Sequence, residues 1–410
     1  MSIDTRKINK DEMYFSLKGD NFDGNVFAME AIEKGAKFSI VDDLEQKDIH
    51  DNIVYVENSL KALQDLSNHH RSLFDTKVIG ITGSNGKTTT KNLIYSILSQ
   101  KYNVIKTKGN LNNHIGVPLS LLNIKDDIDV AIIEMGANHV GEIKRLCEIA
   151  MPDIGLITNY GYAHLEGFGS FEGVIKGKTE MYEYLTENYG HIILNNDDKL
   201  QVENCKGDLA VTFGSNKDSE FIFDYKKDNS SLKLKIDGYE FNSNLFGEYN
   251  FSNLASSITI GKFLDLSNKE IQEGLNKFLN DSNRSEILIF DSNKIYLDAY
   301  NANPTSMLAA ISNFENININ NRVLILGDMF ELGEYSDQEH QKIVDFVTNK
   351  DYSKIYLVGD NFSKCNTDGE YFFKFSNTNE LAQSDSFKSL KNMNILVKGS
   401  RGVSLEKLFK

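Results

Sequence analysis

Short apolar runs alternate with amphipathic helical patterns from the start of the chain. Met13–Leu17 and Phe38–Val41 have the pattern of strands. Val26–Lys34 between them has a helical pattern that ends at Gly35. Strands and helices that alternate in this way are typical of α/β structure. We therefore expect residues 1–75 to form a small N-terminal α/β domain.

A longer series of the same kind follows. Its predicted strands are Lys77–Thr82, Asp129–Met135, Ile154–Thr158 and Ile192–Asn195. Helical patterns lie between these strands, so we expect residues 76–283 to form a central, doubly wound and mostly parallel sheet. Within this range, Glu220–Leu245 alternates polar and apolar residues around Asp228–Asn229 and Asp237–Gly238. These turn signals predict a local antiparallel hairpin region.

The last part of the chain repeats the α/β pattern. Its predicted strands are Ile295–Leu297, Val323–Leu326, Ile355–Val358 and Ile395–Val397. We expect residues 284–410 to form a Rossmann-like C-terminal domain. The predicted fold is therefore α/β with three domains, in which the small N-terminal domain and the C-terminal domain flank the central sheet.

A glycine-containing turn, TGSNGKTTT, directly follows the first strand of the central domain and precedes a helical pattern. Gly83 and Gly86 allow backbone N–H groups to point inward, and the helix N-terminus adds positive potential. Lys87 supplies a cation for the β- and γ-phosphates of a nucleotide, and the Thr88 hydroxyl is placed to bind Mg²⁺. The general P-loop has a glycine where Ile81 stands, so this is the shortened GxxGKT form. A solvated turn is the simpler alternative, which the flanking strand and helix disfavour.

The next two strands of this domain end in side chains that could bind metal. Glu134 ends the strand expected beside the P-loop strand, where open α/β sheets bind ligands, and its hard oxygens suit Mg²⁺. A solvated strand-end glutamate is the alternative. His164 follows the next strand in the glycine-rich segment NYGYAHLEGFGS. Such a histidine is more often structural, but its place past a strand end favours the site. Lys178 and Lys176 lie on the helix that follows, where lysines are usually solvated.

Composition narrows the class of protein. The net charge is −15, from 44 Lys and Arg against 59 Asp and Glu, which argues against nucleic acid or an anionic membrane as the main partner. The three cysteines have no metal-ligand or disulfide spacing. No apolar run approaches the ~18 residues that span a bilayer, so we expect no membrane insertion and a cytoplasmic location. We also expect a monomer.

Six segments in this order resemble the motif set of the Mur ligases: TGSNGKTTT, EMGANHVGEI, NYGYAHLEGFGS, DAYNANPTSM, LGDMFELGE and LVKGSRG. The N-terminal DTRKI and LKGDNFDGNVFAMEAIEKGA resemble the family's uridine-nucleotide domain, so the resemblance spans essentially the whole chain. The GxxGKTT turn is shared with all Mur ligases and with folylpolyglutamate synthase. YNANPTSM and AHLEGFGS are more specific, and resemble the member that joins D-alanyl-D-alanine to UDP-N-acetylmuramoyl-tripeptide.

The resemblance implies an ATP-dependent amide ligase of peptidoglycan precursor synthesis. Its substrates would be UDP-MurNAc-tripeptide and D-Ala-D-Ala, joined through an acyl-phosphate intermediate. Thr88 and Glu134 would hold the Mg²⁺ on ATP, and His164 would help to hold a second Mg²⁺. Lys178 aligns with the family's carbamylated lysine, a modification that would turn a cation into an anionic oxygen donor. The implied catalytic residues are Lys87, Lys178, His164, Asn301 and Asp298.

The resemblance also assigns binding residues. For ATP they are Gly83, Ser84, Asn85, Gly86, Lys87, Thr88, Thr89, Asn250 and Arg284. The alternative for Asn250 is that it caps the helix after it. For the uridine nucleotide, the muramoyl arm and the reacting groups they are Asp4, Thr5, Arg6, Asp23, Asn112, Asn113 and Asn303. His139 and His340 are expected to be structural.

Three alternatives remain open. The Mur ligase that adds the third peptide residue, diaminopimelate or lysine, would be expected to carry a DNPR-like motif, and this chain has YNANP. A P-loop kinase or NTPase would use only Lys87, Thr88 and Glu134 and would leave the other motifs unexplained. A non-catalytic homologue is disfavoured because these three residues occur together with His164 and Lys178.

Overall fold

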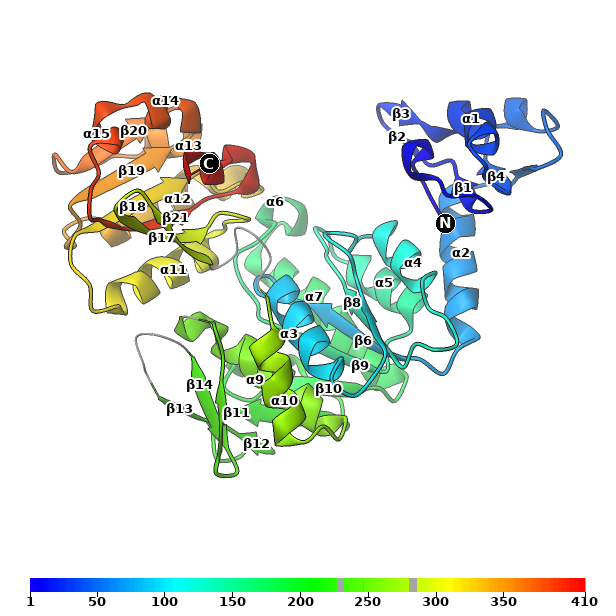
Figure 1. Cartoon of the computed structure of the whole chain (residues 1–410), viewed down its shortest axis with the longest axis horizontal. Helices are drawn as coiled ribbons and strands as arrows, with labels where there is room; N and C mark the ends of the chain where they lie inside the picture. Colours follow the sequence, from blue (N-terminus) through cyan, green and yellow to red (C-terminus); the bar gives the residue numbers. More distant parts are fainter. Residues whose placement is uncertain (227–231, 246, 280–285, 410) are drawn as a thin grey trace.

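The computed structural model describes residues 1–226, 232–245, 247–279 and 286–409. Figure 1 shows the chain as three successive α/β parts, with the N-terminal part joined to the central part through the long helix α2. The expected boundary at residues 283 and 284 lies outside the described residues. Among the described residues, no helix has the length and apolar character needed to cross a membrane.

The N-terminal part is built on a small parallel sheet in the order β1-β4-β5. Its elements are β1 (Met13–Phe15), β2 (Lys18–Gly19), β3 (Phe22–Asp23), α1 (Ala28–Glu33), β4 (Phe38–Val41), β5 (Ile53–Tyr55) and α2 (Ser59–Ser72). The expected strands and helix are present, but the helix begins two residues late. Asp23 accepts from the Asn25 backbone N–H and starts a 3-10 turn, Gly24–Phe27, ahead of α1.

Helix α2 anchors this part to the central sheet. The buried Arg71 near its end donates from Nη2 to Asp153 Oδ2 at 2.9 Å. The same oxygen accepts from the Val78 backbone N–H at 2.7 Å, next to the start of the central strand. One carboxylate therefore fixes the helix against the strand that leads to the P-loop.

The central part is a seven-stranded sheet in the order β12-β11-β10-β9-β6-β8-β7. Every pair of neighbouring strands is parallel. The strands are β6 (Lys77–Thr82), β7 (Val104–Lys106), β8 (Val130–Glu134), β9 (Ile154–Ile157), β10 (His191–Asn195), β11 (Ala210–Gly214) and β12 (Phe221–Ile222). β6 lies between β8 and β9, so the carboxyl ends of the three strands meet at one edge, where open parallel sheets bind ligands.

Helices cover both faces of this sheet, which confirms the doubly wound prediction. The helices are α3 (Lys87–Leu98), α4 (Gly116–Leu121), α5 (Glu142–Ala150), α6 (Leu165–Phe168), α7 (Phe171–Glu187), α8 (Lys199–Asn204), α9 (Phe251–Phe263) and α10 (Asn268–Lys277). Apolar side chains of α4, α5 and α7 form one buried cluster with the sheet, and those of α3, α9 and α10 form another. β6 is buried beyond its first residue because helices lie on both sides of it.

An antiparallel unit interrupts this pattern, as the alternation in Glu220–Leu245 predicts. It consists of β13 (Asp224–Lys226), β14 (Lys233–Ile236) and β15 (Tyr239–Asn242). The turn between β14 and β15 is Asp237–Gly238, and both residues have positive φ, at 50° and 80°. The other turn signal, Asp228–Asn229, lies outside the described residues.

The C-terminal part contains a six-stranded sheet in the order β16-β17-β21-β18-β19-β20. Only β16 pairs antiparallel, at one edge. Its elements are β16 (Glu286–Phe290), β17 (Asn293–Asp298), α11 (Pro304–Asn316), β18 (Arg322–Gly327), α12 (Ser336–Val347), β19 (Lys354–Val358), α13 (Asp360–Lys364), β20 (Phe372–Phe375), α14 (Thr378–Gln383), α15 (Asp385–Lys388) and β21 (Asn394–Lys398). The four predicted strands are present, and the two edge strands β16 and β20 were not predicted.

Candidate active site

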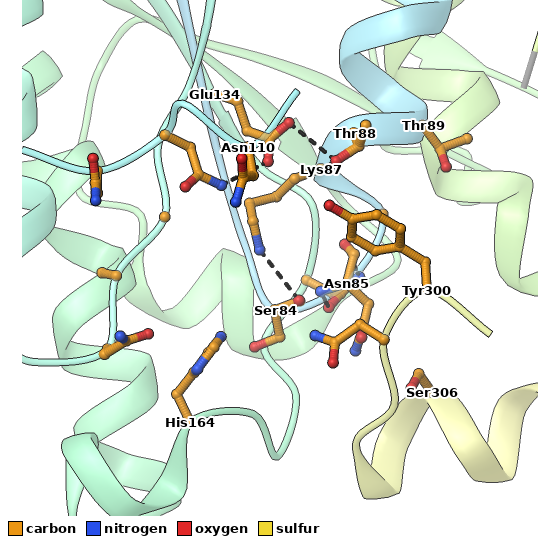
Figure 2. Close-up of a pocket in the computed structure, with 18 of the residues that line it drawn as sticks. Ser84, Asn85, Lys87, Thr88, Thr89, Asn110, Glu134, His164, Tyr300 and Ser306 are labelled. Atoms are coloured by element: carbon orange, nitrogen blue, oxygen red, sulfur yellow. Dashed lines mark hydrogen bonds between the residues drawn. The ribbon is translucent and has the colours of Figure 1, made fainter. Parts of the chain in front are cut away.

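A cavity of about 980 Å³ lies at the carboxyl edge of the central sheet. The P-loop, the loop after β7, Glu134 and His164 line its central side, while Asp298, Tyr300, Asn301 and Lys398 line its C-terminal side. Figure 2 shows Tyr300 and Ser306 facing the P-loop from the C-terminal domain. The site is therefore built between two domains.

The P-loop requires glycine at two positions. Gly83 and Gly86 have φ of 135° and 82°, and a Cβ there would come within 2.0 Å of Thr158 Oγ1 and 2.4 Å of Asn253 Oδ1, respectively. The Lys87 ammonium bends back over the turn, as Figure 2 shows, and donates to the Gly83 and Ser84 carbonyls at 2.6 and 3.3 Å. The turn therefore holds a cation and the N-terminus of α3 at one place, as phosphate binding requires.

Glu134, at the end of β8, is buried and accepts three side-chain hydrogen bonds. Its Oε2 accepts from Thr88 Oγ1 at 3.1 Å and from Lys91 Nζ at 2.9 Å, and its Oε1 accepts from Asn112 Nδ2 at 2.8 Å. Burial raises the pKa of this carboxyl, but the positive charges of Lys91 and Lys87 and the hydrogen bonds outweigh burial and hold the pKa below its ordinary value. Glu134 is therefore a carboxylate, and a solvated strand-end glutamate is excluded.

Lys91 was missed by the sequence reasoning. It lies one helical turn after Lys87 on α3, and this i, i+4 spacing places both lysines on the same face of the helix. Lys91 is also in line with the buried Ile94 and Leu98 of α3, a position from which it could have been recognised as a buried partner for Glu134.

His164 faces a carboxylate of the C-terminal domain. Its Nδ1 contacts Glu331 Oε2. Both residues have positive φ, 55° and 63°, and the Glu166 backbone N–H donates to the Glu331 carbonyl at 3.3 Å. The hydrogen bond with His164 lowers the pKa of Glu331, and the nearby positive charge of Lys87 contributes to the same shift. Glu331, which the sequence reasoning did not single out, also lines the cavity.

Lys178 is deeply buried in α7, whereas Lys176 is exposed. Its Nζ lies 5.3 Å from the centre of the Phe168 ring, and among the described residues it makes no hydrogen bond or ion pair. Burial lowers its pKa well below the ordinary value, and the charge of Lys87 adds to this effect. The structure therefore holds a lysine whose amine is readily neutral.

The loop after β7 and the start of α9 contribute amides. Asn112 donates to Glu134, while Asn113 Oδ1 accepts from the Gly116 backbone N–H at 2.9 Å, and both line the cavity. Asn250 also lines it, and its Oδ1 accepts from Asn253 Nδ2 at 2.9 Å. Asn250 stands at the N-cap position of α9, as the alternative expects, but its side chain makes no capping hydrogen bond there.

The C-terminal residues fall into two groups. Asp298 accepts from Lys398 Nζ at 2.7 Å, and the same ammonium donates to the Asn301 carbonyl at 3.2 Å. Asn303 instead contacts the P-loop through the side chain of Asn85. Arg284 lies outside the described residues.

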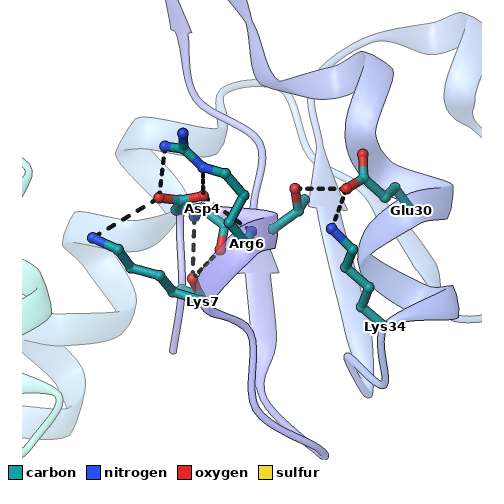
Figure 3. Close-up of polar contacts among 7 residues, drawn as sticks. Asp4, Arg6, Lys7, Glu30 and Lys34 are labelled. Atoms are coloured by element: carbon teal, nitrogen blue, oxygen red, sulfur yellow. Dashed lines mark hydrogen bonds and ion pairs between the residues drawn. The ribbon is translucent and has the colours of Figure 1, made fainter.

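Four predicted uridine-binding residues lie in the N-terminal part and do not line the main cavity. Figure 3 shows two of them, Asp4 and Arg6, paired with each other. Asp4 starts a 3-10 turn, and its carboxylate accepts from Arg6 Nε at 2.8 Å, which lowers its pKa to about 2. Thr5 Oγ1 donates to Glu30 Oε1 at 3.1 Å. Asp23 caps the turn before α1 and pairs with Lys18 at 2.9 Å. Asp4, Thr5 and Arg6 therefore belong to the turn before β1, and Asp23 is the last residue of β3.

Three family models match successive parts of the chain. They are the Mur ligase family catalytic domain over residues 1–71, the Mur ligase middle domain over 81–261 and the Mur ligase glutamate ligase domain over 283–401. The UDP-N-acetylmuramoyl-tripeptide–D-alanyl-D-alanine ligase of Bacillus subtilis (strain 168) is 32% identical over 423 residues, which cover 100% of this chain and 92% of that relative. The chain belongs to the Mur ligase family.

Solved structures of Mur ligases share its architecture. MurF from Acinetobacter baumannii matches with a TM-score of 0.90 and 28% identity, covering 99% of this chain and 91% of that one. The MurF ligase from Thermotoga maritima in complex with ADP matches with a TM-score of 0.87 and 26% identity, covering 99% and 95%. The predicted family and the three-domain α/β fold are thereby confirmed.

Proposed function

We propose that this chain is the ATP-dependent ligase that joins D-alanyl-D-alanine to UDP-N-acetylmuramoyl-tripeptide in peptidoglycan precursor synthesis. One observation carries the proposal. A complete phosphate cradle shares its cavity with the DAYNANP segment of the C-terminal domain, in a chain that matches ligases of this name over its whole length. The identity of 32% to a ligase that adds D-alanyl-D-alanine, against 15% to a solved diaminopimelate-adding ligase, favours this reaction over the addition of the third peptide residue.

The residues around Glu134 suit Mg²⁺. A buried carboxylate and the Thr88 hydroxyl lie 3.1 Å apart at the mouth of the P-loop and offer the hard oxygen ligands that Mg²⁺ prefers. When bound there, the ion would reduce the repulsion between a triphosphate and an incoming carboxylate. For the second ion we propose His164 together with a carbamate on Lys178. The buried and readily neutral amine of Lys178 supports this assignment, because only a neutral amine reacts with CO₂.

The chemistry requires two anions to meet. In the first step, a carboxylate oxygen of the tripeptide forms a bond to the γ-phosphorus of ATP, the bond to the β-phosphate oxygen breaks, and ADP leaves. In the second step, the D-Ala-D-Ala amine attacks the acyl carbon, loses a proton, and displaces phosphate. Lys87 supplies positive charge where the phosphates meet, and the C-terminal domain excludes water from the acyl phosphate.

We propose that different parts of the cavity bind different substrates. We assign ATP to the P-loop side with Asn250, and the muramoyl arm to Asn112 and Asn113. The resemblance to the family also assigns Arg284, which lies outside the described residues, to ATP. The uridine end would reach the N-terminal domain at Asp4, Thr5, Arg6 and Asp23. Asp298 and Asn301 face the cavity from the C-terminal side and would contact the reacting groups.

We also propose that the chain works as a monomer. ATP and UDP-linked precursors are the substrates of the reaction, so we place it in the cytoplasm.

Phosphate release by the purified protein tests this function. With ATP, Mg²⁺ and UDP-MurNAc-tripeptide, we expect release to depend on D-Ala-D-Ala and the product mass to increase by that dipeptide less one water. Lys87→Ala should abolish the release. Release that ignores the dipeptide would favour a P-loop NTPase. Activity with UDP-MurNAc-dipeptide in place of the tripeptide, and with diaminopimelate or lysine in place of D-Ala-D-Ala, would favour the third-residue ligase.

A further inference from the structure

The carboxylate at the proposed Mg²⁺ site already has a positively charged partner. Lys91 Nζ lies 2.9 Å from Glu134 Oε2, and the two side chains are only 2% and 3% exposed. The same oxygen accepts from Thr88 Oγ1 at 3.1 Å. The lysine also donates to the Gly109 carbonyl at 3.3 Å, which holds it between α3 and the loop after β7.

This ion pair weakens the binding of a metal ion that arrives without a nucleotide. A P-loop needs the hydroxyl of Thr88 and one carboxylate for its metal, and Mg²⁺ normally completes its shell with water and substrate phosphates. Here the Lys91 ammonium competes with the ion for Glu134 Oε2. It also balances the charge of Glu134, which is the only negative charge that Thr88 and Glu134 together offer the ion. Lys91 is buried and held by two acceptors, so it has no solvated position to which it can withdraw. Lys91 would therefore repel a divalent cation until the phosphate groups of a nucleotide bring negative charge to the site.

We propose that Lys91 is a positioning residue that serves as the internal counter-ion of Glu134, so that a divalent cation binds Glu134 only together with a nucleotide. This inference rests on the proposed ATP and Mg²⁺ site. Lys91 balances the charge of the buried carboxylate and fixes its orientation before a nucleotide binds, so the metal ion binds as a complex with the nucleotide rather than alone.

Binding of Mn²⁺, followed by electron paramagnetic resonance with and without ADP, tests the proposal. The wild-type chain should bind Mn²⁺ tightly only with ADP. Lys91→Met should bind Mn²⁺ without ADP at least tenfold more tightly than wild type, because Glu134 is left as an uncompensated buried charge. Lys91→Met combined with Glu134→Gln should lose this gain. Lys91→Arg keeps the charge and should behave like wild type, and Lys101→Met removes an exposed lysine and should do the same.

Two results would overturn the proposal. One is wild-type binding of Mn²⁺ without ADP that is as tight as that of Lys91→Met, and the other is a gain that persists when Glu134→Gln is added. If Lys91→Met does not fold, Lys91→Gln removes the charge but retains an amide donor and should show the same gain. Failure of wild type to bind Mn²⁺ even with ADP would instead contradict the metal site of the proposed function, as would the absence of dipeptide-dependent phosphate release.

Discussion

Asn85 of the P-loop and Asn303 of the C-terminal domain bind each other through their side-chain amides. Asn303 Nδ2 donates to Asn85 Oδ1 at 2.7 Å, and Asn85 Nδ2 donates to Asn303 Oδ1 at 3.4 Å. The same Asn303 oxygen accepts from the Ser306 backbone N–H at 2.9 Å and caps α11. The turn that cradles phosphate is therefore tied directly to the start of a helix in the other domain.

Substitution of Asn303 by serine should weaken this tie without removing the helix cap. Serine caps helices as well as asparagine does but is too short to reach Asn85. The loss of a hydrogen bond worth about 1 kcal/mol should lower kcat/KM roughly fivefold, with little change in thermal unfolding. Steady-state kinetics of phosphate release measures the effect. Asn377→Ser makes the same change at the cap of α14 and should leave kcat/KM unchanged. Equal kinetics for both variants would show that the tie has no role in catalysis.

Lys178→Ala should lose activity roughly 100-fold or more, because an anionic ligand of the site would be missing. Added formate or acetate should restore part of the rate in that variant alone, since the small carboxylate can occupy the space of the proposed carbamate. Lys176→Ala is the matched control, because Lys176 lies on the same helix with its side chain exposed. Rescue of Lys176→Ala instead of Lys178→Ala would transfer the proposed carbamate to the other lysine.

The stability of the protein should also depend on Lys178 and pH. Burial lowers the pKa of Lys178 in the folded chain well below 10.5, its ordinary value in the unfolded chain. At a pH between the folded and the unfolded pKa, the unfolded chain therefore holds a proton that the folded chain lacks. Stability from this group therefore rises with pH across that window. In CO₂-free buffer at pH 7, Lys178→Met should raise the melting temperature by at least about 2 °C. The gain should shrink as pH approaches 10.5, and scanning calorimetry at several pH values measures it. A gain that is constant with pH would mean that better packing, rather than the buried amine, is its cause.

The parts of the site that follow directly from local sequence could be predicted well. Gly83, Lys87 and Thr88 lie in one continuous turn, and their geometry depends on the strand and helix on either side. Glu134 could be placed because parallel strands bring their carboxyl ends to the same edge. The buried state of Lys178, in contrast to Lys176, depends on how α7 turns against the sheet, and periodicity alone did not reveal it.

Contacts between domains could not be predicted in the same way. Glu331 reaches His164, and Asn303 reaches Asn85, across sequence separations that no local pattern encodes. Lys91 was missed for a different reason. A lysine on a helix is solvated by default, and only the position of Glu134 on a neighbouring strand makes its burial favourable.

Glu331 should set the orientation of the His164 ring. The carboxylate contacts Nδ1, so it favours the tautomer with hydrogen on Nδ1 and leaves Nε2 as the free acceptor that a metal ligand must be. Glu331→Ala should therefore lower kcat roughly 10- to 100-fold, whereas Glu331→Gln keeps an oxygen acceptor and should retain most of it. The two variants have the same backbone position with positive φ, so strain at residue 331 affects both comparably. Nitrogen-15 spectra of the imidazoles, with His164 assigned through His164→Gln, should show the tautomer shift in Glu331→Ala and not in Glu331→Gln. Equal kinetics and equal spectra for the two variants would mean that the carboxylate contributes only to the contact between domains.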